Sequence, residues 1–303
     1  MATNPMPDRG NGQRVSFFDA IDANKRNSLL LIAFLTFLVF LAISAFALMF
    51  DMGWLGFAMG AVIAILYALF SYYIGDRALL ALSGAKPVSR EANPYLYNLV
   101  EGLAIAAQIP APKLYMMEDA SLNAFATGRD PQHSAIVVTR GLAEKMNRAE
   151  LEGVVAHEMS HIGNYDIRYM LITVVMVGLI GFMGEIILRS LFFGGGNRKG
   201  GGGMLMLLGL VLAILTPIIA MLVKLAVSRE REYLADATAV KLTRYPDGLR
   251  NALIKIRDHY QPTKAATDTT ASLYFADPIG KKLTGLFATH PPIEERIKLL
   301  EKF

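Results

Sequence analysis

Long apolar runs free of charged residues dominate the first quarter of the chain. Leu29–Phe50 contains 22 uncharged positions, and Trp54–Ile74 follows after the short turn Asp51–Gly53. A helix of about 20 apolar residues spans the hydrocarbon core of a bilayer, so each run is long enough to cross it. The tripeptide Ala45-Phe46-Ala47, with a small residue at each end, would also fit a signal-peptide cleavage site. The polar lead is long and the apolar run is of span length, so we expect a helical hairpin instead.

Two further apolar runs occur in the second half of the chain. They are Tyr169–Phe193 and Met204–Val227, and a flexible glycine-rich linker at 194–203 joins them. Glu185 and Arg189 interrupt the third run four positions apart, where they form either a structural pair near the outer interface or a functional one. The chain is therefore expected to cross the membrane four times.

The distribution of lysine and arginine orients these spans. Four cations precede the first span, namely Arg9, Arg14, Lys25 and Arg26, whereas the turn between the first two spans has none. Three more follow the second span, namely Arg77, Lys86 and Arg90. Because cytoplasmic loops are enriched in such residues, we expect the polar segments to face the cytoplasm. The two cations in the glycine-rich linker oppose this orientation.

The polar segment between the two hairpins combines helical and strand patterns. Pro94–Gln108 has the spacing of a helix, and Lys113–Met117 and Ala135–Thr139 are rich in residues that favour strands. Leu122–Gly128 alternates and then turns, which indicates either an edge strand that pairs with an extended peptide or an ordinary hairpin.

The composition favours a membrane protein and indicates which classes of partner it contacts. Of the 303 residues 53% are hydrophobic and the mean hydropathy is +0.38, more apolar than a typical soluble domain. The absence of cysteine excludes disulfides and thiolate metal sites. The net charge of +4 is explained by cytoplasmic lysine and arginine. We therefore expect contact with a lipid bilayer and none with nucleic acid.

One predicted helix carries a metal-binding pattern. Asn147 and Glu150 have the spacing of a capping box, so the helix begins there and runs through His157-Glu158-Met159-Ser160-His161. Residues four apart lie on one side of a helix, where His157 and His161 can hold one zinc ion. Glu158 is then placed to take a proton from a water molecule. The alternative is a chance match in a buried helix, although the chain has only 5 histidines.

A third metal ligand is expected just after the fourth apolar run. Glu232 and Asp236 are four apart, so one carboxylate can bind the ion while the other orients a histidine. Glu230 points roughly 200° away from Glu232 on a helix and shares its face with Leu234, so Glu232 is the predicted ligand. The alternative is an ordinary charged segment beside a membrane.

The C-terminal part, after residue 246, offers fewer candidate functional residues. Asp247–Tyr260 is predicted to be a helix capped by Asp247, and 261–285 to form a loop over the site. His290-Pro291-Pro292 is expected to open a last helix with the prolines in its first turn. Considered alone, His290 would be a surface histidine.

Four motifs in this order resemble the HtpX family of membrane zinc proteases, which is related to the CAAX prenyl protease group. The motifs are Asn123–Gly128, His157–His161, Ser228–Ala237 and His290–Pro292. The resemblance implies an α+β fold with a zincin-like (gluzincin) catalytic domain and one zinc ion per chain. It implies a multi-pass protein of the bacterial inner (plasma) membrane, whose catalytic domain faces the cytoplasm.

The resemblance also assigns roles to single residues. It implies that His157, His161 and Glu232 bind zinc and that Glu158 is the general base. It implies that Asn123 holds the substrate backbone, and that His290 binds substrate or stabilises the oxyanion. The substrates it implies are polypeptides, chiefly damaged membrane proteins degraded under stress.

We therefore predict a zinc-dependent endopeptidase that is divided in sequence by membrane hairpins. A polar segment at 1–28 precedes a hairpin at 29–74, and a second hairpin at 169–227 separates catalytic parts at 75–168 and 228–303. Two other classes remain open. One is a metal-dependent membrane enzyme that acts on a non-protein bond, and the other is a membrane chaperone or scaffold with a vestigial metal site.

Overall fold

The computed structural model describes residues 17–49, 52–175, 178, 229–280 and 290–303. Most of the expected third span and all of the fourth lie outside the described residues. So do the glycine-rich linker, Glu185 and Arg189. The expected topology of the second hairpin therefore stays a prediction.

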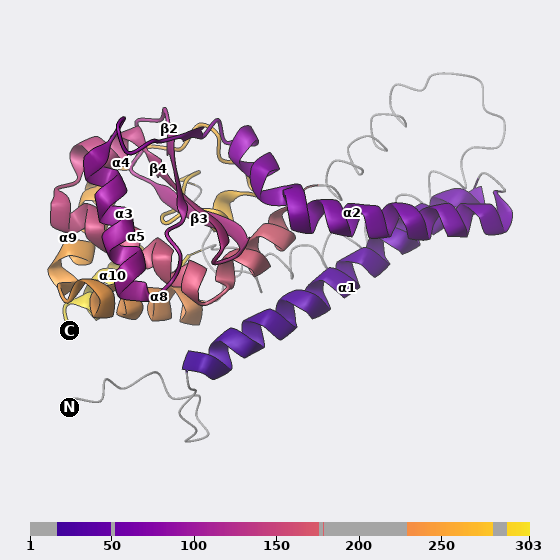
Figure 1. Ribbon diagram of the computed structural model, residues 1–303, viewed down its shortest axis with the longest axis horizontal. Coiled ribbons are helices and arrows are strands. Elements are labelled where there is room, and N and C mark those ends of the chain that lie inside the picture. The colour runs from indigo at the N-terminus through magenta and orange to yellow at the C-terminus, as the bar shows by residue number, and fades with distance from the viewer. Residues whose placement is uncertain (1–16, 50–51, 176–177, 179–228, 281–289) are drawn as a thin grey trace.

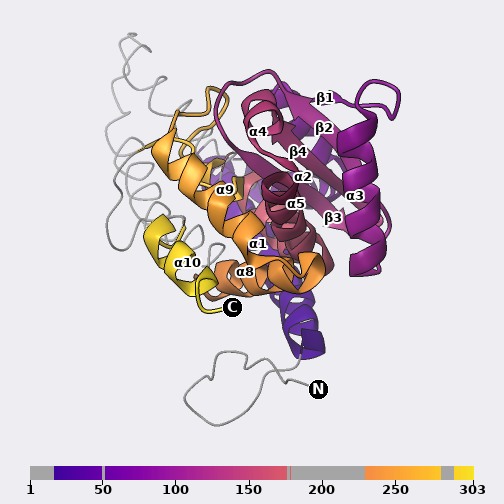
Figure 2. The same ribbon diagram turned by 90° about the vertical axis from the view of Figure 1, so that its left-hand side faces the viewer.

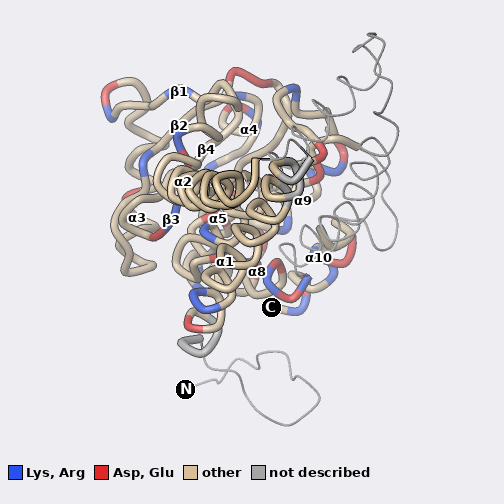
Figure 3. The backbone as a smooth tube through the Cα atoms, turned by 90° about the vertical axis from the view of Figure 1, so that its right-hand side faces the viewer, with Lys and Arg blue, Asp and Glu red and all other residues tan. Residues whose placement is uncertain are grey.

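Two long helices form a hairpin that projects away from the rest of the chain (Figure 1). Helix α1 is Phe17–Met49 and helix α2 is Gly53–Leu82, so α1 begins within the expected polar lead and α2 extends beyond Ile74. Their apolar windows are only 33% and 17% buried, whereas a core helix of a soluble protein would be mostly buried. The charged residues of the two helices lie in the first turns of α1 and the last turns of α2, and Figure 3 shows those of α1 near its N-terminal end. The exposed surface of the hairpin suits a lipid environment.

A four-stranded sheet lies at the centre of the body. Its strands are β1 (Lys86–Pro87), β2 (Lys113–Met117), β3 (Ala124–Asp130) and β4 (His133–Thr139). The spatial order is β1-β2-β4-β3, with β2 and β4 parallel and the other pairs antiparallel. Strand β3 therefore lies at an edge of the sheet, as predicted, and it also forms an antiparallel hairpin with β4, which was the alternative. Its outer side is partly covered, because Phe125 bridges Tyr274.

Helices cover the sheet and surround the predicted metal-binding helix (Figure 2). They are α3 (Pro94–Ala107), α4 (Arg140–Lys145), α5 (Arg148–Gly163), α8 (Arg229–Thr243), α9 (Pro246–Asp258) and α10 (Ile293–Leu300), with a 3-10 turn η1 (Ala271–Leu273). Residues 166–175 continue as a helix after α5. Helix α5 contacts the sheet on one side and α8 and α9 on the other.

The predicted start of α5 is confirmed, and two other predicted helix starts are wrong. The side chain of Asn147 accepts a hydrogen bond from the backbone N–H of Glu150, and the carboxylate of Glu150 accepts one from the backbone N–H of Asn147, which completes the capping box. Asp247 does not cap α9, which begins at Pro246 because proline suits the first position of a helix. The prolines after His290 likewise precede α10 instead of forming its first turn.

The apolar side chains of α5 form the centre of the core. Leu151, Val154, Val155, Met159 and Ile162 are each at most 1% exposed, as the helical spacing predicted. The backbones of α5 and α9 also approach closely, since a Cβ at position 153 would lie 2.7 Å from the backbone nitrogen of position 249. Helix α5 is therefore enclosed, and its polar side chains must be satisfied by protein groups or by a bound ion.

Candidate metal centre

Three buried side chains from α5 and α8 converge on one point. The Nε2 atoms of His157 and His161 lie 3.2 Å apart. The carboxylate of Glu232 lies 3.7 Å from the first and 3.6 Å from the second. In the part of the chain that the structure describes, these residues form a group able to hold a metal ion. Ligands bonded at about 2.0–2.2 Å to a tetrahedral ion are about 3.3–3.6 Å apart, so the three donors fit such an ion.

The position of Glu232 follows from the helical phase of α8. Glu232 is 1% exposed and faces the histidines, whereas Glu230 is exposed. The two carboxylates therefore point in different directions, as their spacing predicted. Asp236, one turn after Glu232, is buried beside it.

Each histidine has a carboxylate behind it. Nδ1 of His157 lies 2.9 Å from Oδ1 of Asp236, and Nδ1 of His161 lies 3.1 Å from Oδ2 of Asp166. A carboxylate on Nδ1 fixes the tautomer in which the Nε2 lone pair faces the ion. Asp236 was predicted for this role from the sequence. Asp166 was not predicted for this role, although it follows His161 by only five positions.

Arg296, in the first turns of α10, is a site residue that the sequence analysis missed. It is 2% exposed, and its guanidinium donates from Nε and Nη2 to the two oxygens of Asp236 at 2.9 and 2.7 Å. It also donates from Nη1 to the carbonyl of Phe275 at 3.0 Å. The ring of Phe275 lies edge-on to that of His157 at 4.9 Å, so the loop expected over the site does contact it. Arg296 therefore joins α8, α10 and this loop at the metal centre.

The surroundings give the two histidines opposite proton affinities. Burial, together with the nearby charge of Arg296, lowers the pKa of His157 to about 4. Burial opposes protonation of His161 as well, but the carboxylates of Asp166 and Glu232 raise its pKa to about 9. Burial would raise the pKa of Glu232, yet the adjacent histidines, His290 foremost, hold it well below its usual range. The site thus offers an anionic oxygen and a neutral imidazole, and His161 must lose a proton to bind a cation.

Glu158 lies between the two histidines in sequence and is 2% exposed. Burial raises the pKa of its carboxyl to about 7, although the charge of His161 acts in the opposite direction. The backbone of Ala126, in strand β3, also acts to lower this pKa. A carboxyl that titrates near neutrality can both accept and return a proton, which a general acid–base catalyst requires.

His290 and Asn123 occupy different surroundings. The side chain of His290 is 8% exposed, and its Nδ1 lies 3.3 Å from Oε2 of Glu232, so it is not the surface histidine that its position alone suggested. Its Nε2 is buried without a partner among the described residues. Asn123 instead bonds the backbone of Ala276, donating to its carbonyl at 3.0 Å and accepting from its N–H at 3.1 Å. A peptide held by Asn123 would have to take the place of residue 276.

Comparison with known proteins identifies relatives over nearly the whole chain. The sequence profile of Peptidase family M48 matches residues 90–303. The chain is 46% identical over 286 residues to a protein named Protease HtpX homolog from Dictyoglomus turgidum, covering 94% of each chain. A protein of the same name from Thermoanaerobacter pseudethanolicus is 41% identical over 294 residues, covering 95% of this chain and 98% of the relative.

A solved structure has the same fold. The crystal structure of Ste24p from S. mikatae superposes with a TM-score of 0.52 at 21% sequence identity. The superposition covers 94% of this chain and 66% of the Ste24p chain. This likeness extends beyond the family match at 90–303 to the N-terminal hairpin.

Proposed function

The chain belongs to peptidase family M48 and is a membrane-associated metalloprotease, and from that premise we propose that it is a zinc-dependent endopeptidase. His157, His161 and Glu232 would hold one zinc ion. The observation that carries the proposal is the convergence of these three donors at 3.2, 3.6 and 3.7 Å. The donor set of two imidazoles and one carboxylate is typical of catalytic zinc sites, which keep a further position for water or substrate.

The proposed reaction is hydrolysis of a peptide bond. When bound, the ion polarises the scissile carbonyl and lowers the pKa of a water molecule. Glu158 accepts a proton from the attacking water and later delivers it to the leaving amine. The neutral form of His157 at physiological pH, supported by its lowered pKa, keeps that imidazole available as a ligand.

Two further residues are proposed to bind the substrate. His290, whose Nε2 lacks a partner among the described residues, would contact substrate or stabilise the oxyanion beside Glu232. Asn123 would hold the substrate backbone at the edge of β3. Its present bonds to the backbone of Ala276 support this role, because they are the bonds that an extended peptide would make.

The proposed substrates are misfolded or damaged membrane proteins, degraded in quality control under stress. The exposed apolar hairpin α1–α2 supports this proposal, since it would keep the metal centre beside the bilayer. The cations at its base, Lys25, Arg26 and Arg77, support an orientation with the catalytic body in the cytoplasm of a bacterial cell. The second hairpin at 169–227 would complete a multi-pass protein of the inner membrane.

Substitution of Glu158 by Gln tests the catalytic part of the proposal. Gln removes the proton acceptor and keeps the shape of the side chain, so we expect full zinc content and essentially no hydrolysis of casein by the detergent-purified protein. Zinc content is measured by elemental analysis of the same sample. Appreciable turnover by zinc-loaded Glu158→Gln would contradict the proposed base.

A further inference from the structure

The first long helix reaches the metal centre through one buried side chain. Asn24, in the second turn of α1, is 8% exposed. Its Nδ2 donates to Oδ1 of Asp166 at 2.8 Å and to the carbonyl of Asn164 at 2.9 Å. The other carboxylate oxygen of Asp166 lies 3.1 Å from Nδ1 of His161. A continuous set of hydrogen bonds therefore runs from α1 to a proposed metal ligand.

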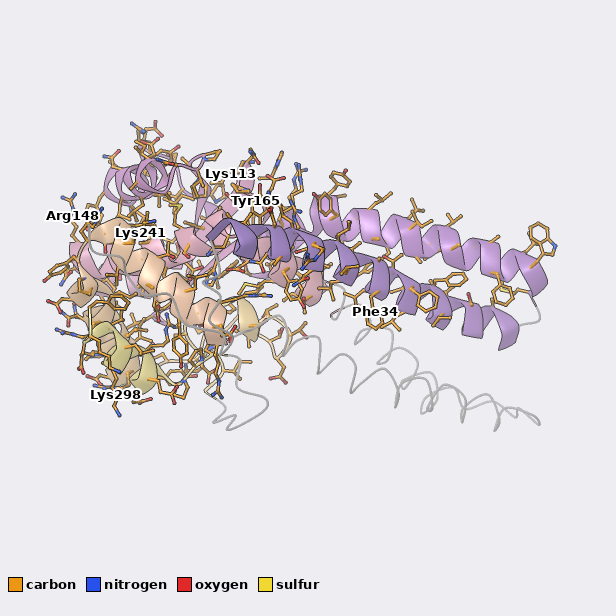
Figure 4. All side chains as sticks on the ribbon, turned by 90° about the horizontal axis from the view of Figure 1, so that it is seen from below. Phe34, Lys113, Arg148, Tyr165, Lys241 and Lys298 are labelled. Atoms are coloured by element: carbon orange, nitrogen blue, oxygen red, sulfur yellow. The ribbon has the colours of Figure 1, made fainter. Side chains whose placement is uncertain are left out.

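The turn that Asn24 contacts is an unusual piece of backbone. Asn164 ends α5, and Tyr165 has φ of +62°, a left-handed conformation that a tyrosine rarely adopts without support. The ammonium group of Lys25 lies over the ring of Tyr165, 4.5 Å from its centroid. Figure 4 shows Tyr165 beside the end of α1 that meets the body. Adjacent residues of α1 thus hold all three residues of the turn at 164–166.

The amide of Asn24 is the closest hydrogen-bond donor to Oδ1 of Asp166 among the described residues. Asp166 is 1% exposed, so water does not solvate its carboxylate. Oδ2 faces His161, and the nearest cation to Oδ1 is Nε of Arg231 at 3.8 Å, beyond hydrogen-bond distance. Without the amide of Asn24, Oδ1 would lack a close donor among the described residues, and a buried acceptor without a donor is costly. Rotation of the carboxylate towards Arg231 would then take Oδ2 away from His161.

We propose that Asn24 is a positioning residue for the metal centre: by holding Asp166, it fixes the orientation in which His161 presents Nε2 to the ion. The first membrane helix is then part of the support of the metal site as well as an anchor. This inference rests on the proposed zinc site. The competing explanation is that Asn24 only packs α1 against the body.

Zinc affinity of the full chain in detergent measures this role without relying on activity. Asn24→Leu removes the donor while keeping a side chain of similar size. Supporting residues behind a metal ligand typically contribute 10–100-fold in affinity, so we expect a loss of about tenfold, measured by competition with a chromophoric zinc chelator. Thr36→Val is the matched control, because it deletes a hydroxyl that bonds only within α1, to the carbonyl of Ile32. The control should bind zinc like the wild type.

A double-mutant cycle separates positioning from packing. If Asn24 acts through Asp166, Asn24→Leu should lower zinc affinity in the wild type and have no effect in an Asp166→Asn background. If it only packs α1, the two losses should multiply. Multiplying losses, or an unchanged affinity in Asn24→Leu, would overturn the inference.

Two controls keep the outcome interpretable. Gel filtration and the thermal midpoint of unfolding report whether each variant is folded. If Asn24→Leu aggregates, Asn24→Ala replaces it, because alanine favours a helix and is too small to clash. A wild type that binds no zinc would refute the proposed function itself. A wild type that binds zinc with the same affinity as both Asn24 variants would refute this inference alone.

Discussion

The two histidines of the metal centre are supported in different ways. Behind His157, Asp236 is held by the bidentate guanidinium of Arg296, a buried cation from the C-terminal helix. Behind His161, Asp166 is held by the neutral amide of Asn24 from the N-terminal helix. The carboxylates are similar in burial and in distance to their histidines. What differs is the charge of the group that donates hydrogen bonds to each carboxylate, since Arg231 lies 3.8 Å from Asp166, beyond hydrogen-bond distance.

That difference explains the opposite pKa shifts. Arg296 offsets the negative charge of Asp236, so burial dominates and the pKa of His157 falls to about 4. Asp166 has no cation within hydrogen-bond distance among the described residues, and its charge together with that of Glu232 raises the pKa of His161 to about 9. The surroundings thus favour a neutral imidazole at His157 and a protonated one at His161.

Removing Arg296 should have the largest effect. Arg296→Met leaves the buried carboxylate of Asp236 without its cation. Removing one partner of a buried ion pair lowers the free energy of unfolding by about 3–5 kcal/mol. Urea denaturation in detergent measures the loss. Arg257→Met is the matched control, because Arg257 pairs with Asp258 at the surface and an exposed pair contributes little. Equal stability of the two variants would show that Asp236 does not need its cation.

Neutralising the two carboxylates should weaken zinc binding unequally. Asp236→Asn and Asp166→Asn each remove the anion that orients a ligand, and such changes cost about 10–100-fold in metal affinity. We expect the greater loss in Asp236→Asn, because it also leaves the cation of Arg296 with Glu232, 3.8 Å away, as its remaining carboxylate, where it competes with the ion. Chelator competition gives both affinities. A larger loss in Asp166→Asn would reverse the comparison.

The pH dependence of zinc binding should be set by His161. Below its pKa of about 9 the imidazole carries a proton that the ion must displace, so affinity should rise with pH and level off near pH 9. The slope should be about tenfold per pH unit, since one proton is released. Asp166→Asn removes a charge that raises this pKa, so its plateau should begin at lower pH. Identical profiles for the wild type and Asp166→Asn would show that the charge of Asp166 does not raise the pKa of His161.

The local parts of this arrangement are readable in the sequence. A capping box, an apolar face and two histidines four apart define α5, and helical phase alone distinguishes Glu232 from Glu230. Alternation between Leu122 and Gly128 indicated the edge strand. Each of these signals lies within about ten neighbouring residues, where the period of a helix or strand constrains which side chains share a face.

The supports of the site are not readable in the same way. Asn24 lies 142 residues from Asp166, and Arg296 lies 60 residues from Asp236. Asn24 is a polar residue in a polar segment, and Arg296 is a charged residue on an amphipathic helix, so neither breaks a local pattern. Their partners are determined by how α1 and α10 pack on α5 and α8. The pairing of Asn123 with Ala276 was missed for the same reason, because a loop position carries no periodicity.

The central claim, that His157, His161 and Glu232 hold a single zinc ion, is tested most directly by zinc-to-protein ratios of the wild type, Glu232→Gln and Glu230→Gln. Both variants neutralise one glutamate of α8, two positions apart. The account predicts about one zinc per chain in the wild type and in Glu230→Gln, and far less in Glu232→Gln, because a neutral amide replaces the anionic ligand. Loss of zinc from Glu230→Gln with retention in Glu232→Gln would contradict the proposed metal centre.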